Sequence, residues 1–222
     1  MIAILGVLHA VQTYLIKHVG VTRGRFYLAI FNLDLEASFG TWFSTMLLLA
    51  IAVALWWISR SRAEYRTHWR WLAYLVLFMS CDEVASIHER FSYVYAWAKR
   101  WGYGLSPMFF FGWTIPALIA LAVVTVLYIR FLIALPAHHR ARMLMAAVCY
   151  FGGAVGVELW SSTIAIQENG TDSAAFAWLT LLEESLEMIG LALGLRAVLL
   201  VLTESRTELT VSVNQPVDSQ SV

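Results

Sequence analysis

A cluster of ionisable residues inside an apolar stretch is the feature that most constrains this chain. Residues 71–79 form an apolar run that is typical of half a membrane-spanning helix. Asp82, Glu83, His88 and Glu89 follow within eight residues, before the chain turns apolar and aromatic again. Ionisable groups at membrane depth are costly and are retained mainly where they face partners, a cavity or an ion. We therefore asked what the rest of the chain could place against this cluster.

The composition indicates an integral membrane protein. Of the 222 residues, 60% are hydrophobic and only 14% are charged, whereas a soluble domain carries about 25% charged residues. The 15 Lys and Arg residues balance 15 Asp and Glu residues, which argues against a nucleic-acid partner and leaves the lipid bilayer as the expected one. The predicted fold class is all-α, a membrane-embedded helical bundle.

Five confident transmembrane helices are predicted from the apolar runs. They cover residues 41–58, 71–92, 108–135, 143–166 and 174–202. The N-terminal segment Met1–Ile16 is shorter than the roughly 20 residues that a span needs, so it is a sixth span or an interfacial helix. The predicted domains are residues 1–26, an N-terminal apolar segment with a basic linker, residues 27–202, the bundle, and residues 203–222, a disordered tail.

The distribution of arginine predicts the orientation of the bundle. Short cytoplasmic loops are enriched in Lys and Arg. The loop after the first span carries Arg60, Arg62, Arg66 and Arg70, and a second basic stretch runs from Arg130 to Arg142. If the spans alternate, both lie on one side together with the C-terminus, which we predict to be cytoplasmic. The basic linker at residues 17–25 falls on the other side and weakens this assignment.

Acidic residues from separate segments fall at similar predicted depths. With a rise of ~1.5 Å per residue, Asp82 lies ~16 Å from the start of its span, and Glu183 lies ~15 Å from the opposite surface. Glu158 falls in the outer half of the fourth span, and Asp34 and Glu36 precede the first span at its outer end. The sequence therefore predicts one carboxylate and histidine site in the outer half of the bundle.

The helical spacing of these acids allows two chemical interpretations. In continuous helices, Asp82, Ser86 and Glu89 would share one face, and Glu183 and Glu187 would be neighbours one turn apart. Such carboxylates cannot all be ionised in a low dielectric without a cation, so they share protons or bind a metal. The predicted catalytic residues are Asp82, Glu83, His88 and Glu89. The predicted metal ligands are His88, Glu89, Glu158, Glu184 and Glu187, a donor set that suits Zn, Mn or Fe.

Structural interpretations stand beside these functional ones. Glu158 precedes Ser161 and Ser162 and could be a hydrogen-bond partner between helices. The pair His138–His139 lies in a basic turn and is expected to be solvated or to contact lipid head groups. Gly152, Gly153 and Gly156 are expected to serve helix packing.

Several of these motifs together resemble a known family. They are Asn32-Leu33-Asp34-Leu35-Glu36 before Thr41-Trp42-Phe43-Ser44, Asp82-Glu83 followed by His88-Glu89, Gly156-Val157-Glu158, and Glu183-Glu184 with Glu187-Met188. The pattern is similar to a family of uncharacterised bacterial multi-pass membrane proteins. The resemblance implies the bacterial cytoplasmic membrane and supports treating the acids as one site, and it supplies no substrate.

Three functions are compatible with this pattern. The first is a membrane enzyme in which a metal or a shared-proton carboxylate cluster acts on a lipid-borne or small substrate. The second is a proton- or cation-coupled transporter, which would need polar groups that continue to the inner side. The third is a structural subunit whose acids only hold the helices together. The sequence favours the first and leaves the oligomeric state open.

Overall fold

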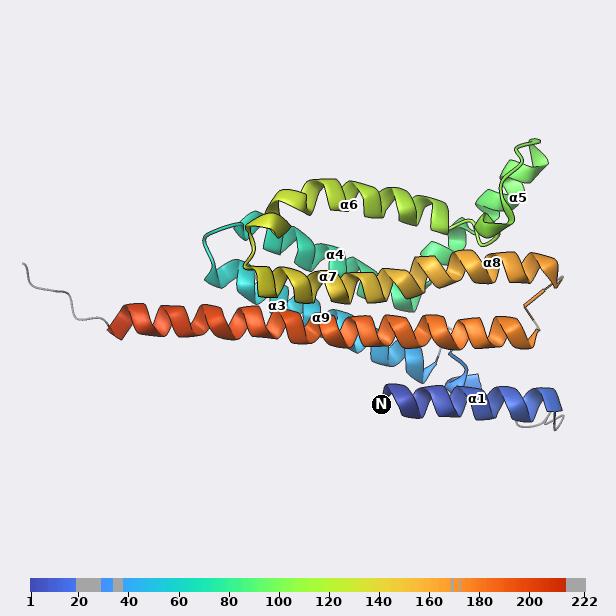
Figure 1. The fold of residues 1–222 in the computed structure, drawn as a ribbon, viewed down its shortest axis with the longest axis horizontal. Helices are drawn as coiled ribbons and strands as arrows, with labels where there is room; N and C mark the ends of the chain where they lie inside the picture. Colours follow the sequence, from blue (N-terminus) through green and yellow to red (C-terminus); the bar gives the residue numbers. More distant parts are fainter. Residues whose placement is uncertain (19–28, 34–37, 169, 172, 215–222) are drawn as a thin grey trace, which may run out of the picture.

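The computed structural model describes residues 1–18, 29–33, 38–168, 170–171 and 173–214. Every element in these ranges is helical, and the helices form an elongated bundle (Figure 1). The main helices are α1 Ile2–His18, α3 Phe39–Ser61, α4 Arg66–Ala85, α5 Tyr93–Arg100, α6 Thr114–Ala134, α7 Ala137–Phe151, α8 Glu158–Gln167 and α9 Ala174–Asn214. Short 3₁₀ segments are η1 Ala29–Phe31, η2 His88–Phe91 and η3 Pro107–Phe109, and η4 Gly152–Val157 is a π-helix.

Four helical segments are long and apolar enough to cross a membrane. They are Phe39–Ser61, Thr114–Ala134, Ala137–Gln167 and Ala174–Glu204. The predicted all-helical bundle is confirmed for the described residues. Helix α4, the second predicted span, is not among the four because its ends carry Arg66, Arg70, Asp82 and Glu83. The count of five spans therefore stays a prediction.

The apolar core lies toward one end of the bundle. We call this the basic end, where α3 ends and α4 begins, and where α6 ends and α7 begins. The arginines in these two turns or in the adjoining ends of the helices include Arg60, Arg62, Arg66, Arg70 and Arg140. Buried aliphatic residues of α3 and α9, including Leu55, Ile58 and Val201, pack here against Trp69 of α4 and Phe131 of α6. The Trp69 and Phe131 rings meet edge to face with centroids 4.7 Å apart.

Helix α6 is fixed to the bundle mainly at its two ends. Its two fully buried residues are Thr114 in the first turn and Phe131 in the last. At the basic end, the Tyr128 hydroxyl also donates a hydrogen bond to the His68 carbonyl of α4, at 3.0 Å. Only 6% of the apolar stretch of α6 is buried. The middle of α6 is therefore left without a packed core behind it.

Helix α9 makes its closest contacts with α7 and η4 through glycines. A Cβ atom added to Gly190 would lie 2.5 Å from the Tyr150 nitrogen, and one added to Gly153 would lie 2.8 Å from the Glu183 carbonyl oxygen. The predicted packing role is therefore supported for Gly153. It is wrong for Gly152 and Gly156, where an added Cβ would meet nothing within 4 Å.

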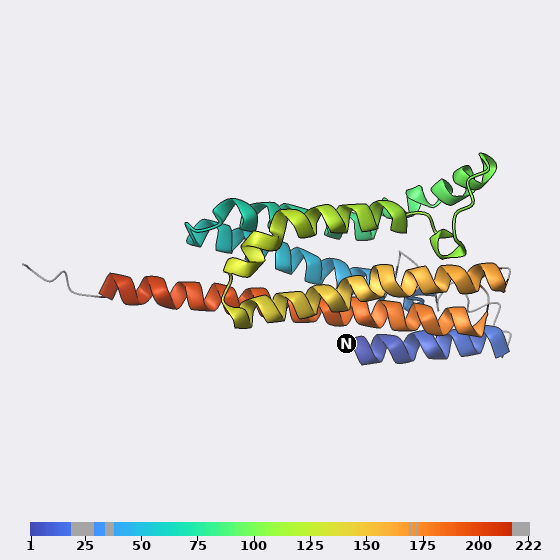
Figure 2. The ribbon, with the colours of Figure 1, turned by 45° about the horizontal axis from the view of Figure 1, so that its top comes forward.

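The N-terminal helix is part of the bundle. Figures 1 and 2 show α1 alongside the first half of α9, and Leu5 of α1 is buried in a small cluster with Leu33 and Met188. Buried His9 accepts a hydrogen bond on Nδ1 from the Leu33 backbone, at 3.0 Å. Residues 19–25 of the basic linker and the last eight residues lie outside the described ranges. Helix α9 continues to Asn214, past residue 203 where the sequence places the start of a disordered tail.

The segment from α5 to η3 lies at the opposite end of the bundle. Helix α5 projects away from the other helices in both views (Figures 1 and 2), whereas η3 returns to pack against α8. The exposed side chains of the segment include Tyr93, Trp97, Trp101 and Tyr103, with Lys99 and Arg100 between them. Aromatic and basic side chains of this kind are enriched where a protein meets the membrane–water interface.

The close approach at Gly190 predicts a specific loss of stability. Replacing Gly190 with Ala forces α7 and α9 apart, and overpacking of this kind costs about 1–3 kcal/mol. The expected result is a lower thermal unfolding midpoint for the detergent-solubilised protein. Gly152→Ala is the matched control, because its added Cβ meets nothing and alanine favours helix over glycine. Equal midpoints for Gly190→Ala and wild type would contradict the packing described here.

Candidate functional site

The site begins where α4 stops. The helix ends at Ala85, and Ser86 adopts a left-handed conformation with φ 48° and ψ 44°. The chain then turns through the 3₁₀ segment η2 instead of continuing as a helix to residue 92. The predicted face formed by Asp82, Ser86 and Glu89 is therefore wrong, because these residues do not belong to one helix.

This turn brings His88 back onto Asp82. One carboxylate oxygen of Asp82 accepts the His88 backbone N–H, and the other contacts His88 Nδ1, both at 2.9 Å. In a continuous helix, side chains six residues apart would project in different directions and lie about 9 Å apart along the axis. The break in α4 is thus what makes the Asp82–His88 pair.

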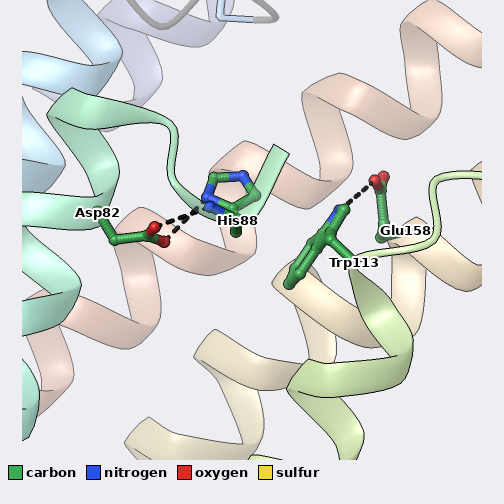
Figure 3. Close-up of polar contacts among 4 residues, drawn as sticks. All are labelled: Asp82, His88, Trp113 and Glu158. Carbon is green, nitrogen blue, oxygen red and sulfur yellow. Dashed lines mark hydrogen bonds and ion pairs between the residues drawn. The ribbon is translucent and has the colours of Figure 1, made fainter. Parts of the chain in front are cut away.

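A tryptophan connects this pair to α8. The Trp113 ring meets the His88 ring edge to face, with centroids 4.8 Å apart. Trp113 Nε1 donates to Glu158 Oε1 at 3.0 Å, and the Ser161 hydroxyl donates to Glu158 Oε2 at 3.1 Å. Figure 3 shows Asp82, His88, Trp113 and Glu158 following one another from α4 to α8. Glu158 is thus a hydrogen-bond partner between helices, as expected, but to Trp113 next to α6 rather than to a residue of α4; its bond with Ser161 lies within α8.

Glu158 also contacts an acid of α9. Its carboxyl group lies near that of Glu183, close enough for the two charges to interact. Two carboxyl groups can hydrogen-bond to each other only if one of them carries a proton. Both oxygens of Glu158 already accept bonds from Trp113 and Ser161, so a proton shared by the two acids would be carried by Glu183. The position of the two acids is compatible with the shared-proton interpretation, which stays a prediction beside metal binding.

The side chains of Asp82, His88, Trp113, Glu158 and Glu183 line one cavity of about 570 Å³. One wall comes from α4, η2, α8 and α9 and is acidic. Its ionisable side chains are Asp82, Glu83, His88, Glu89, Glu158, Glu183, Glu184 and Glu187. An apolar wall comes from the first half of α6, with Pro116, Ala117, Ala120, Leu121 and Val124. The structure therefore places every predicted catalytic residue and metal ligand around a single space, while Asp34 and Glu36 lie outside the described residues.

The π segment η4 aligns the cavity face of its helix. Tyr150, Ala154 and Glu158 all line the cavity at intervals of four residues. In an α-helix each such step drifts by about 40° around the axis. The wider turns of a π-helix offset that drift, and π segments are frequent at functional sites. This local geometry turns both Tyr150 and Glu158 toward the same space.

Sequence reasoning missed two features of the polar network. In the sequence, Trp113 looks like one of many aromatic residues expected at a membrane interface. Its spacing from other residues does not predict that it donates to Glu158. The other feature is at the basic end, where His139 Nε2 lies 2.7 Å from Glu204 Oε2. His139 is only 1% exposed, so the expectation of a solvated histidine is wrong at this position.

The predicted metal ligands do not form the tightest group of donors. Across the described ranges, the one set of three His, Cys, Asp or Glu side chains whose ligand atoms all lie within 4.8 Å is His138, His139 and Glu204. The predicted set of His88, Glu89, Glu158, Glu184 and Glu187 surrounds the cavity more loosely. Its role in binding a metal stays a prediction.

Comparison with known proteins adds a family. The sequence profile of a domain of unknown function, DUF8692, matches residues 1–202. The chain belongs to this family. The DUF8692 match includes α1 and the whole acidic wall of the cavity, and it agrees with the resemblance to an uncharacterised family. No curated protein and no solved structure matches the chain.

The Asp82–His88 pair predicts how firmly η2 is held. Replacing Asp82 with Asn exchanges charge-assisted hydrogen bonds for neutral ones, a difference of about 1–2 kcal/mol. We expect trypsin to cleave after the exposed Arg90 about tenfold faster in Asp82→Asn than in wild type. Mass spectrometry of timed digests measures this rate. Glu64→Gln, an exposed acid at the basic end, is the control, and an unchanged rate in Asp82→Asn would contradict the assigned role.

Proposed function

We propose that this chain is a membrane-embedded acid–base enzyme that acts on a lipid-borne or small amphipathic substrate. The observation that carries the proposal is the cavity of about 570 Å³. The hydrogen-bonded Asp82–His88 pair and the neighbouring acids Glu158 and Glu183 line this space, together with apolar side chains of α6. Cavities of roughly 300–1,000 Å³ are the usual size of small-molecule sites.

His88 is the proposed general base. Because Asp82 accepts on both oxygens when ionised, His88 Nδ1 is the donor of their contact, and Nε2 is the atom that accepts a proton in the neutral ring. A carboxylate that fixes the tautomer and stabilises the protonated ring is the arrangement of an acid–base histidine. Asp82 is thus the orienting group, and His88 takes the proton from an attacking water.

The Glu158–Glu183 pair is the proposed proton donor. The proton that Glu183 shares with Glu158 is available to a leaving group on the substrate. Trp113 and Ser161 stabilise Glu158 in its ionised form by donating to it. The two pairs come from opposite ends of the connected series Asp82, His88, Trp113 and Glu158, so base and acid can flank one reacting bond.

The remaining carboxylates are proposed to bind a divalent cation. Glu89, Glu184 and Glu187 line the same space as His88 and Glu158. Several carboxylates around one low-dielectric space need a counter-ion or shared protons. Carboxylate donors suit Mn among the predicted ions Zn, Mn and Fe, since His88 Nε2 is taken by its role as proton acceptor. The ion would polarise the substrate or its attacking water.

The same reasoning proposes a location. The basic end faces the cytoplasm of a bacterial cell under the positive-inside rule, which puts α9 beyond residue 203 on the cytoplasmic side. The cavity then lies toward the outer leaflet. This position supports a substrate that is delivered by the membrane, because the apolar wall on α6 suits a hydrocarbon chain.

A transporter is supported less well. It would need a polar path from the cavity to the basic end, and the described residues there form the apolar core around Leu48, Leu55, Trp69 and Phe131. A purely structural role would leave the lipid composition unchanged when the acids are neutralised. Both alternatives are separable from an enzyme by experiment.

The test compares wild type with His88→Gln in nanodiscs that contain extracted bacterial lipids. We expect wild type to convert at least one lipid species, detected by mass spectrometry, and His88→Gln to do so about 100-fold or more slowly, the usual contribution of a general base. Cys81→Ser, an exposed neighbour, is the control for folding and reconstitution. Identical lipid profiles for both proteins, with proton-driven uptake in vesicles, would favour the transporter.

A metal measurement tests the proposed cation. The metal content of the purified protein, measured by elemental analysis, should fall by about one ion per protein on Glu184→Gln or Glu187→Gln, because each substitution removes a charged ligand. Glu168→Gln, an exposed acid beyond the cavity, is the matched control. Equal metal content in Glu184→Gln, Glu187→Gln and wild type would assign the cavity to the shared-proton form alone.

A further inference from the structure

We propose a second metal site, distinct from the cavity, in which His138, His139 and Glu204 bind a single Zn²⁺ ion. These residues lie at the basic end and join the start of α7 to α9. The inference does not depend on the proposed enzyme function. It assigns to the basic end a cation cross-link between segments that are 65 residues apart.

The three side chains converge from two helices. His138 and His139 lie in the first turn of α7, directly after the turn that follows α6, and their rings have centroids 4.1 Å apart. Glu204 Oε2 lies 2.7 Å from His139 Nε2 and 3.6 Å from His138 Nε2. All three ligand atoms lie within 4.8 Å of one another. In Figure 1, the start of α7 lies beside α9, which continues beyond it.

These separations are compatible with one ion. Zinc bonds of about 2.0–2.2 Å in a tetrahedral site place neighbouring ligand atoms about 3.3–3.5 Å apart. The contact between Glu204 and His138 is already close to that spacing. The shorter contact to His139 is a hydrogen bond, and a small rotation of the Glu204 side chain, which is 46% exposed, would open it.

The donor set indicates the kind of metal. Two imidazoles and one carboxylate are the three protein ligands of a known class of zinc site, with water in the fourth position. His138 is 52% exposed and His139 is 1% exposed. One side of the site is therefore fixed by packing, and the other side is open for the ion to enter.

Burial of His139 supports a strong partner on its Nε2 atom. Within the described part of the chain, its Nδ1 atom is buried and has no hydrogen-bond partner. A buried polar ring is costly unless its polar atoms are satisfied. The cost of burying this ring is therefore offset only through Nε2, the atom that contacts Glu204 and would bind the proposed ion. The nearby Arg140 guanidinium donates to the Ile133 carbonyl at 3.1 Å, which directs its charge toward the end of α6.

The expected effect of the ion is to fix the turn between α6 and α7 onto α9. Helix α6 is held at this end by Phe131 and is otherwise almost unburied. A metal ion held at the start of α7, directly after the turn that follows α6, would reinforce that attachment. Because the site is remote from the cavity, its loss should leave the cavity residues in place.

The test titrates the full-length protein, purified in detergent with a histidine-free affinity tag, with Zn²⁺ in competition with a chromophoric chelator. Wild type should bind one equivalent that is at least about tenfold weaker in His138→Asn and in Glu204→Gln. Both side chains are half exposed, so these variants should fold. Glu64→Gln, an exposed acid at the same end, is the control. Thermal unfolding with and without Zn²⁺ should show a rise in midpoint for wild type that both variants lose.

Two results would overturn the site. The first is wild-type Zn²⁺ affinity and an unchanged midpoint shift in both His138→Asn and Glu204→Gln. The second is loss of the bound equivalent in Glu187→Gln but not in Glu204→Gln, which would assign the ion to the cavity. Conversely, retention of this equivalent in Glu187→Gln supports the site at the basic end, whatever the outcome for the cavity.

Discussion

The contact on which the acidic wall depends is the one between Asp82 and His88. It exists because α4 stops at Ala85 and Ser86 takes a left-handed conformation. That turn returns His88 to the carboxylate three residues before the break and places its ring against Trp113, which in turn holds Glu158. A single interruption of one helix thus connects α4, the start of α6 and α8. A continuous helix would have separated these groups.

The cavity itself results from an uneven distribution of packing. Near the basic end, aliphatic and aromatic side chains fill the space between α3, α4, α6 and α9. Toward the other end, Gly153 lets η4 approach α9 closely. Helix α6 has no buried residue between Thr114 and Phe131. Polar groups that are costly in an apolar core are collected where the core is absent. The same chain thus separates a stabilising half from a half that is able to hold a ligand.

The sequence predicted the helical class and the convergence of the acids, because both follow from residue type and helical rise. Depth along a span placed Asp82, Glu158 and Glu183 at one level before any contact was known. It could not predict the break after Ala85, since nothing in the residues around Ser86 marks a helix end. The Glu204–His139 contact was also beyond it, because a pairing 65 residues apart depends on how α7 and α9 pack. Local patterns fix depth, whereas side-chain partners depend on tertiary structure.

The attachment of α6 at its two ends has a mechanical consequence. A helix held at Thr114 and Phe131, with little buried between them, can bow outward without breaking the contacts that stabilise the bundle. The volume available to a ligand is then uncoupled from the free energy of folding. Larger or smaller side chains at Ala117 or Ala120 would reshape the binding space while the core at the other end stays intact. Relatives of this chain could in this way diverge in what they accept while keeping one scaffold.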